Sequence, residues 1–323
     1  MKDLIDQSVR KITEASSRAA GRVEKLREFS HITTRDSLLE LVGKKLKDRK
    51  LILVSNREPY AHVLKGDGIA VIRNAGGLTI ALDSIARAFH SVWVCQGSAN
   101  ADFKVAGPDG LVAVPPGEPS YHLKRLALTP QEEQGYYEGF SNETLWPLCH
   151  VCYVRPKFLP SDWRTYDQVN RKFAEAVAET APPDSLVFLQ DYHLCRVAHH
   201  LKALRSDLVT ALFWHIPWPN PEIFRILPWK KEVLEGLLAN DILGFHLKYH
   251  AENFMETVGL ELECRIDGEK SRVERGDRVT QVNAYPISID FESIFLQSEG
   301  PAVVKAGRET AAERGLEGLK VIL

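Results

Sequence analysis

Short, largely apolar runs that alternate with helical patterns constrain the fold of this chain more than any other feature. The runs are Leu51–Ser55, Val92–Cys95, Leu186–Leu189, Thr210–Trp214, Ile242–Phe245 and Lys320–Leu323. Such runs are typical of strands that are buried on both faces of a parallel sheet. Helical patterns lie between many of them, at Leu78–Phe89, Tyr166–Glu179, Ala198–Leu204, Lys230–Leu238 and Tyr249–Val258. The order predicts an α/β fold, a Rossmann-like parallel sheet with helices on both faces.

The segments flanking this pattern differ from it. Residues 1–50 carry 13 Lys and Arg against 8 Asp and Glu, a net charge of +5, and the rest of the chain therefore carries −7. Apolar residues spaced as in a helix run from Ile5 to Leu26, and a second helix is expected from near Thr33 to Val42. This extension is either a partner-binding arm or a segment folded back on its own domain. We favour the second, because short weak heptads rarely stand alone. Between Gly107 and Leu128 we expect turns and short strands beside the sheet.

Composition excludes several classes of protein. The 323 residues are 44% apolar and 26% charged, which is ordinary for a soluble globular protein of one or two domains. A formal net charge of −2 argues against a nucleic-acid-binding protein. No apolar run is long enough to span a membrane, and the charged N-terminus does not resemble a secretory signal. The five cysteines are sparse, which fits the cytoplasm. Cys149 and Cys152 have no second pair at zinc-ligand spacing, so we expect buried thiols and no metal.

The loops that follow the apolar runs carry the candidate functional residues, because ligands bind beyond the carboxyl ends of parallel strands. Arg57 follows the first run, Asp191 the third and His215 the fourth. A guanidinium suits a phosphate, while a carboxylate and an imidazole suit sugar hydroxyls; the last two could equally form a structural hydrogen-bond network. Gly76 and Gly77 open a predicted helix, whose N-terminus would favour an anion.

Aromatic residues cluster further along the chain, at Tyr136, Tyr137, Phe140 and Trp146. Aromatics gathered at a loop can stack on sugar rings, although such residues more often belong to a core. The phosphate-loop, zinc-protease and serine-hydrolase motifs are absent from the sequence. A dinucleotide-dependent oxidoreductase is disfavoured because the first strand is not followed by that family's glycine fingerprint.

Several blocks of sequence, taken in order, resemble the trehalose-6-phosphate synthase family, the family 20 retaining glycosyltransferases. The resemblance covers about Leu51 to Asp290. Its blocks are Val54-Ser55-Asn56-Arg57, Ala75-Gly76-Gly77-Leu78, Tyr136-Tyr137 through Trp146-Pro147, Trp163 through Asn170, Gln190-Asp191-Tyr192-His193-Leu194, His215-Ile216-Pro217-Trp218-Pro219, Asp241 through His246, and Tyr285 through Asp290.

The resemblance implies the acceptor-binding first domain of a two-domain glycosyltransferase of the GT-B type. The helical extension 1–50 lies outside the resemblance, which implies 51–318 as this domain and 319–323 as the first strand of a missing donor domain. By motif position, Arg57 would contact the acceptor phosphate and Gly76 and Gly77 the donor diphosphate. The residues expected around the acceptor glucose are Tyr137, Trp146, Asp191 and His215, with His215 and Asp191 next to the reacting hydroxyl.

The implied reaction is glucosyl transfer from a nucleoside diphosphate glucose, as co-substrate, to glucose 6-phosphate. Retention would follow from front-face displacement, with the leaving phosphate as the base and without a metal or other cofactor. Two departures put the acceptor in question: Gln96 stands where the family commonly has a second tryptophan, and about a dozen extra residues separate Arg57 from Gly76.

The expected partners are a sugar phosphate and a sugar nucleotide, with no nucleic acid and no membrane. A second copy of the chain, or a chain carrying the donor domain, remains open. So does the alternative of a non-catalytic sugar-phosphate-binding or regulatory protein. If the chain is the acceptor half of a glycosyltransferase, as the resemblance implies, it would be inactive alone.

Overall fold

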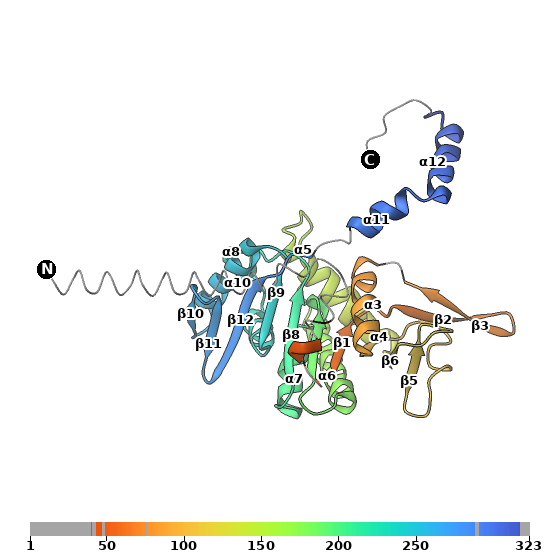
Figure 1. The fold of residues 1–323 in the computed structure, drawn as a ribbon. Coiled ribbons are helices and arrows are strands. Elements are labelled where there is room, and N and C mark those ends of the chain that lie inside the picture. Colours follow the sequence, from red (N-terminus) through yellow and green to blue (C-terminus); the bar gives the residue numbers. More distant parts are fainter. Residues whose placement is uncertain (1–39, 41–42, 47–48, 75, 288–290, 317–323) are drawn as a thin grey trace.

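The fold is a ten-stranded sheet in the order β10-β11-β12-β9-β8-β7-β1-β4-β6-β5 (Figure 1). The computed structural model describes residue 40 and residues 43–46, 49–74, 76–287 and 291–316. The strands of the sheet are β1 Leu51–Ser55, β4 Val92–Gln96, β5 Leu111–Val114, β6 Tyr121–Leu126, β7 Leu186–Gln190, β8 Val209–Trp214, β9 Ile242–Phe245, β10 Arg265–Asp267, β11 Arg272–Arg275 and β12 Arg278–Ala284. The seven neighbours from β12 to β6 are parallel, and β5, β10 and β11 pair antiparallel at the two edges.

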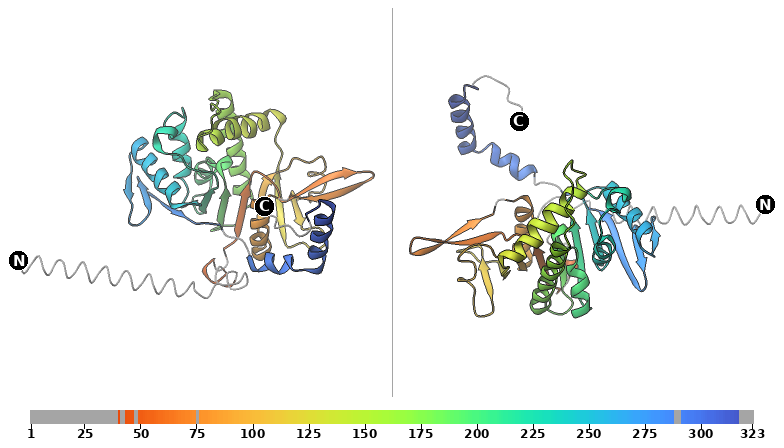
Figure 2. Two further views of the ribbon diagram at one scale, coloured as in Figure 1. Left: turned by 90° about the horizontal axis from the view of Figure 1, so that it is seen from above. Right: turned by 180° about the vertical axis from the view of Figure 1, so that it is seen from behind.

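Helices cover both faces of this sheet (Figure 2). They are α3 Gly77–Phe89, α4 Pro130–Glu133, the π-helix η1 Gln134–Leu145, α5 Trp146–Cys149, α6 Pro160–Thr180, the 3₁₀ turn η2 Tyr192–Leu194, α7 Val197–Leu204, α8 Pro221–Phe224, α9 Lys230–Leu237, α10 Lys248–Glu261, α11 Phe291–Ser298 and α12 Pro301–Glu313.

Strand β1 shows why a wholly apolar run lies at the centre of the sheet. All five of its residues are buried. Ile52 and Val54 face the larger core, which α6, α7, α9 and α10 help to form. Leu51 and Leu53 face the smaller core under α3. Because successive side chains of a strand point to opposite faces, only a run that is apolar at every position can fill both cores.

Five of the six predicted strands, and the five helices predicted to alternate with them, are present with ends shifted by a few residues. The sixth strand, Lys320–Leu323, lies outside the described residues, as do the first helix predicted in the N-terminal extension and almost all of the second. The prediction for Gly107–Leu128 was wrong in part. Its strands β5 and β6 belong to the main sheet, where β6 pairs parallel to β4. Their runs are short and alternate between buried and exposed residues, so they lack the continuous apolar pattern of the central strands.

Two segments extend from the sheet. The antiparallel hairpin of β2 Tyr60–Lys65 and β3 Gly68–Arg73 occupies the stretch between Arg57 and Gly76 (orange in Figure 1). Helices α11 and α12 lie away from the sheet in Figure 1 and in the right-hand view of Figure 2, and α12 buries none of its residues. Within the part of the chain that is described, no helix combines the length and apolarity needed to cross a membrane.

Candidate functional site

The site lies where the strand order of the sheet reverses. After β1 the chain crosses to β4, whereas after β7 it crosses to β8 on the other side. The carboxyl ends of β1 and β7 are adjacent, because the two strands pair in parallel. In open α/β sheets, this reversal leaves a crevice in which ligands bind. Arg57 follows β1 and Asp191 follows β7, so the fold brings these two predicted residues to one place, together with Tyr192 and His193.

Arg57 is the exposed residue in a buried stretch from Leu51 to Tyr60. Its guanidinium donates a hydrogen bond of 2.8 Å to the hydroxyl of Tyr137 and lies 5.9 Å from the centre of that ring. The hydrogen bond to Tyr137 raises the pKa of Arg57, so the side chain is a fixed cation. The Tyr137 ring in turn stacks on His193 at 5.5 Å. Two residues that are 80 positions apart therefore form one unit with a cation at the surface.

Asp191 occupies a sharp turn with φ of 73°. Its carboxylate accepts hydrogen bonds from the backbone N–H of Tyr192 at 2.9 Å and of His215 at 3.1 Å. Burial raises the pKa of Asp191, and hydrogen bonds from backbone N–H groups, including that of Ile216, lower it. The resulting pKa is about 6. Asp191 is thus mostly ionised at neutral pH and is held directly against the predicted partner His215.

His215 is a neutral imidazole at neutral pH. Burial, and then the neighbouring His246, lower its pKa to about 4. Its Nε2 lies 2.9 Å from Oε1 of Gln190, so donation to that oxygen places the ring proton on Nε2. The ring also packs against Phe213, at 4.6 Å between centroids. A neutral ring held in this way can exchange hydrogen bonds with a sugar hydroxyl.

Helix α6 supports the turn that carries Asp191 and His193. The hydroxyl of Tyr166 donates to the carbonyl oxygen of Tyr192 at 2.5 Å. The side-chain amide of Asn170 donates to the carbonyl oxygen of His193 at 3.0 Å. Both side chains are fully buried. The turn is therefore held by buried hydrogen bonds from a long helix, which suits a binding site.

Tyr137 and Trp146 lie on helices, and the prediction of an aromatic loop was wrong. The chain from Pro130 to Cys149 is continuously helical through α4, η1 and α5. π-helical turns are rare and occur often at functional sites. Tyr137 points to Arg57, whereas Trp146 is 42% exposed and stacks on His150 rather than on the Tyr137–His193 pair. Cys149 is buried as predicted, but Cys152 is only partly buried.

Gly76 and Gly77 form the N-terminus of α3, as predicted. Helix α3 connects the parallel strands β1 and β4, so it runs back along the sheet and begins near their carboxyl ends. Gly76 and Gly77 are exposed, and without side chains they leave the backbone N–H groups open to an anion.

Three polar atoms at this edge were missed by the sequence prediction. Asn56 Oδ1, Gln190 Nε2 and His193 Nε2 are buried and make no hydrogen bond within the structure. Burial, Arg57 and His215 lower the pKa of His193 to about 3, so this ring is neutral. Buried polar atoms normally have partners, so atoms without one mark places for a ligand or water. Asn56 and Gln190 adjoin a predicted site residue in sequence and His193 lies two positions from one, and this proximity was the available signal.

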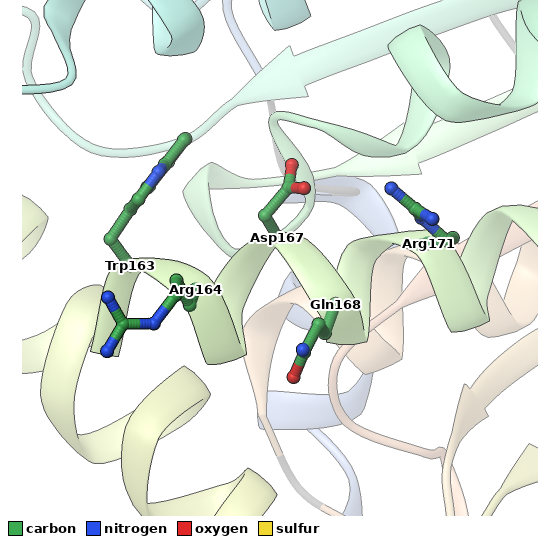
Figure 3. A pocket seen from close by; sticks show the side chains of 5 residues that line it. All are labelled: Trp163, Arg164, Asp167, Gln168 and Arg171. Carbon is green, nitrogen blue, oxygen red and sulfur yellow. The ribbon is translucent and has the colours of Figure 1, made fainter. Parts of the chain in front are cut away.

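A separate cavity of about 310 Å³ lies on the surface of α6 (Figure 3). It is lined by Trp163, Arg164, Asp167, Gln168 and Arg171, and it shares no residue with the loops described above. Among the described residues, no three His, Cys, Asp or Glu side chains are grouped so as to hold a metal.

Comparison with known proteins places this geometry in a family. Residues 49–323 match glycosyltransferase family 20. The chain is 37% identical over 279 residues to the trehalose-6-phosphate synthase of Mycolicibacterium vanbaalenii, covering 82% of the chain and 55% of the relative. It is 36% identical over 287 residues to that of Mycobacterium leprae, covering 84% and 56%. The chain thus spans about half the length of these relatives.

Solved structures agree with this match. A structure from E. coli, described as trehalose-6-phosphate bound with UDP-2-fluoro glucose, has a TM-score of 0.67 at 27% identity, covering 81% of this chain and 54% of that one. The UDP-forming synthase from Burkholderia xenovorans has a TM-score of 0.64 at 25% identity, covering 80% and 53%. The α/β architecture expected for a GT-B glycosyltransferase domain is thereby confirmed.

Proposed function

The chain belongs to glycosyltransferase family 20, and on that premise we propose that it binds the sugar-phosphate acceptor in a retaining glucosyl transfer. The donor would be a nucleoside diphosphate glucose and the acceptor glucose 6-phosphate. The observation that carries this proposal is the convergence of Arg57, Tyr137, Asp191 and His215 at the reversal point of the sheet.

Arg57 takes the acceptor phosphate in this proposal. It is exposed, cationic and fixed by Tyr137. A guanidinium can direct two parallel N–H groups at a phosphate, while one of its donors stays on the tyrosine hydroxyl. The neutral rings of Tyr137 and His193 beneath it leave the positive charge of Arg57 uncompensated there, which favours a dianion over a neutral sugar.

Asp191 and His215 take the glucose ring. The ionised carboxylate accepts hydrogen bonds from sugar hydroxyls, and the neutral imidazole can orient the hydroxyl that attacks the donor. Asp191 contacts the His215 backbone, so the two groups keep a fixed spacing. Trp146, whose ring is partly exposed, would complete the acceptor site at its outer side.

Gly76 and Gly77 take one side of the donor diphosphate, at the N-terminus of α3. The relative from E. coli binds UDP-2-fluoro glucose, which supports a uridine or similar nucleotide in this role. Front-face displacement would then make the leaving phosphate the base for the acceptor hydroxyl. The N-terminus of a helix, with its N–H groups directed at that phosphate, would stabilise the charge that develops on it.

Arg57→Ala tests the proposal directly. A charge-assisted hydrogen bond contributes about 1.5–3 kcal/mol, so the variant should bind glucose 6-phosphate about tenfold or more weakly. Titration calorimetry with glucose 6-phosphate and with glucose measures the preference for the phosphorylated sugar. Arg275→Ala is a matched control, because Arg275 pairs with Glu235 and belongs to β11, which lies next to the outermost strand of the sheet and away from β1 and β7. A variant at Arg57 that keeps the native preference would show that the phosphate binds elsewhere.

A further inference from the structure

Arg125, at the carboxyl end of β6, is the centre of a buried cluster of ionisable side chains. Its Nε donates to Oε2 of Glu58 at 2.5 Å, and its Nη2 donates to Nδ1 of His62 at 2.8 Å. Nη2 also lies 3.4 Å from the carboxylate of Asp102. Further donors of Arg125 reach the backbone oxygens of Asp102 at 2.9 Å and Tyr60 at 2.6 Å. We call these four side chains the Arg125 cluster: Glu58, His62, Asp102 and Arg125.

The Arg125 cluster is far more buried than charged groups usually are. The exposed fractions are 2% for Glu58, 0% for Asp102, 8% for Arg125 and 6% for His62. Burying ionic groups is costly, and a well-packed apolar cluster of similar volume is often at least as stable. Stability alone therefore gives a weak reason for this arrangement, and its location suggests another.

The Arg125 cluster fixes the backbone on one side of Arg57. Glu58 is the next residue in the chain, and its carbonyl oxygen accepts from the Asn74 side chain at 2.6 Å. His62 belongs to β2 and Asp102 to the loop after β4, and Asp102 accepts from the N–H of His62 at 2.7 Å. On the other side of Arg57, the carbonyl oxygen of Asn56 accepts from the N–H of Gln96 at 3.0 Å. The exposed arginine thus projects from a turn that is held from both sides.

The packing around Arg125 leaves little freedom for this turn. A Cβ atom at Gly97 would lie 3.0 Å from Cδ of Arg125 and 3.0 Å from Cζ of Phe103. Gly97 directly follows Gln96, the residue that stands in place of a family tryptophan. The loop after β4 therefore closes against the guanidinium of Arg125, and a movement of the cluster would be passed on to the turn that carries Arg57.

We propose that the Arg125 cluster positions Arg57, and that Glu58 thereby sets the affinity of the site for the phosphate of its acceptor. This inference rests on the proposed function, because it assumes that Arg57 contacts that phosphate. No member of the cluster touches the ligand itself. Glu58 and Arg125 are positioning residues, and their effect on binding should vanish when Arg57 is absent.

The protonation state of the Arg125 cluster allows a second test of this proposal. Burial, and then a hydrogen bond to Asp102, raise the pKa of Glu58 to about 8 against the lowering effect of Arg125. Burial opposes ionisation of Asp102, but hydrogen bonds from Glu58 and from backbone N–H groups lower its pKa overall. Burial and Arg125 lower the pKa of His62, and burial raises that of Cys95 on β4, so both stay neutral near pH 8. Near neutral pH, Arg125 and Asp102 balance each other, and the carboxyl group of Glu58 is largely protonated.

A double-mutant cycle tests the positioning role. Glu58→Ala should weaken glucose 6-phosphate binding about fivefold or more in the native protein, yet change it little in an Arg57→Ala background. Asp241→Asn is the control. Asp241 also accepts hydrogen bonds from a backbone N–H, that of Thr210, and from a cation, Lys202, but it lies at the amino ends of the parallel strands, whereas the site lies at their carboxyl ends. This substitution should lower the thermal stability without changing the affinity. Equal effects of Glu58→Ala in both backgrounds would overturn the inference.

The pH dependence of the affinity of Glu58→Gln provides a second test, which can be carried out even if the alanine variant does not fold. An amide can accept from Arg125 and cannot ionise, so it mimics the protonated carboxyl group. Above pH 7 the sugar phosphate is already a dianion, because its second pKa is about 6. Native affinity should fall between pH 7 and 9.5 as Glu58 ionises, and Glu58→Gln should remain flat. Identical profiles would overturn the inference.

The two proposals fail in different ways. If Arg57→Ala leaves the affinity unchanged, the proposed role of Arg57 is wrong and this inference falls with it. If Arg57→Ala weakens binding but the Glu58 variants do not, only the inference is wrong.

Discussion

At the scale of single residues, Asp191 carries a charge that lowers the stability of the fold. Its pKa of about 6 lies above the ordinary value of 3.8, so the folded state disfavours the ionised form. The stability linked to this group is fully present below pH 3.8 and is lost as the pH rises through 6. The folded protein therefore holds a carboxylate at neutral pH at the expense of stability, in a turn with positive φ. Such strain is found where the surrounding structure and a function require it.

Asp191→Asn should therefore separate stability from function. The variant should melt at the native temperature or above at pH 7, and its advantage over the native protein should shrink toward pH 4, where Asp191 is largely protonated. Its affinity for glucose 6-phosphate should fall about tenfold or more, since a charge-assisted hydrogen bond contributes about 1.5–3 kcal/mol. Thermal melts at both pH values and calorimetric titrations measure the two effects. Native affinity in the variant would rule out a contact between this carboxylate and the sugar.

The residues at the site were predictable to the extent that they directly follow apolar runs. Arg57, Asp191 and His215 do so, and the structure places them at one edge of the sheet. The Arg125 cluster was not predictable in this way, because Glu58 and Arg125 are 67 positions apart and meet only through strand pairing. Trp146 shows the reverse case: its sequence position suggested contact with the other aromatics, but the helix turns its ring toward His150.

At the scale of elements, the packing of η1 on α6 sets the position of Tyr137. Gly135 and Gly139 are one helical turn apart and face α6. A Cβ atom at Gly135 would lie 2.8 Å from Cβ of Thr165, and one at Gly139 would lie 2.5 Å from Oδ2 of Asp162. The two glycines therefore allow the helices to approach closely, and Tyr137 lies between them in the sequence. Because α6 also holds the turn after β7, one helix relates Tyr137 to Asp191.

Gly135→Ala should disturb this relation. No rotation of Thr165 can move its own Cβ, so η1 must shift, and overpacking of this kind costs about 1–3 kcal/mol. The affinity for glucose 6-phosphate should fall as well, because Tyr137 moves away from Arg57. Gly307→Ala in α12 is the matched control: nothing lies within 4 Å of its added Cβ, so neither property should fall. Urea denaturation and titration of both variants provide the measurement. A stable Gly135→Ala variant with native affinity would contradict the assignment.

Most elements could be predicted from the sequence because buried parallel strands and amphipathic helices each have a strong pattern. The hairpin β2–β3 was noticed only as extra length, although Gly66 at its turn, with φ of 57°, is a typical hairpin signal. Strand β3 and the outer end of β2 are largely exposed, so burial leaves no regular pattern along the whole hairpin. The π-helix η1 was not predictable, since hydrophobic periodicity separates helices from strands but does not resolve how a helix is wound.

At the scale of the whole molecule, the two proposed binding sites use different parts of the fold. The residues proposed to bind the acceptor gather at the reversal point between β1 and β7, and the N-terminus of α3 is proposed to contact the donor. The relatives that resemble this chain are nearly twice as long as the part it covers. Catalysis of a transfer between two bound substrates depends on holding both in register. Binding of the acceptor and turnover can therefore be separated by experiment.

A polypeptide of these 323 residues should bind glucose 6-phosphate yet not catalyse transfer at the rate of its longer relatives. These residues span about half the length of the relatives that they match, and the family resemblance assigns the donor to a second domain. Among the described residues, the Gly76–Gly77 backbone is the group proposed to meet the charge that develops on the leaving diphosphate. Losing even one preorganised contact of this kind typically lowers a rate about 100-fold or more. Incubation with several nucleoside diphosphate glucoses and glucose 6-phosphate, followed by measurement of the released diphosphate, tests this expectation. Release at the rate of a full-length synthase, abolished by Arg57→Ala, would show that these residues contain a complete donor site.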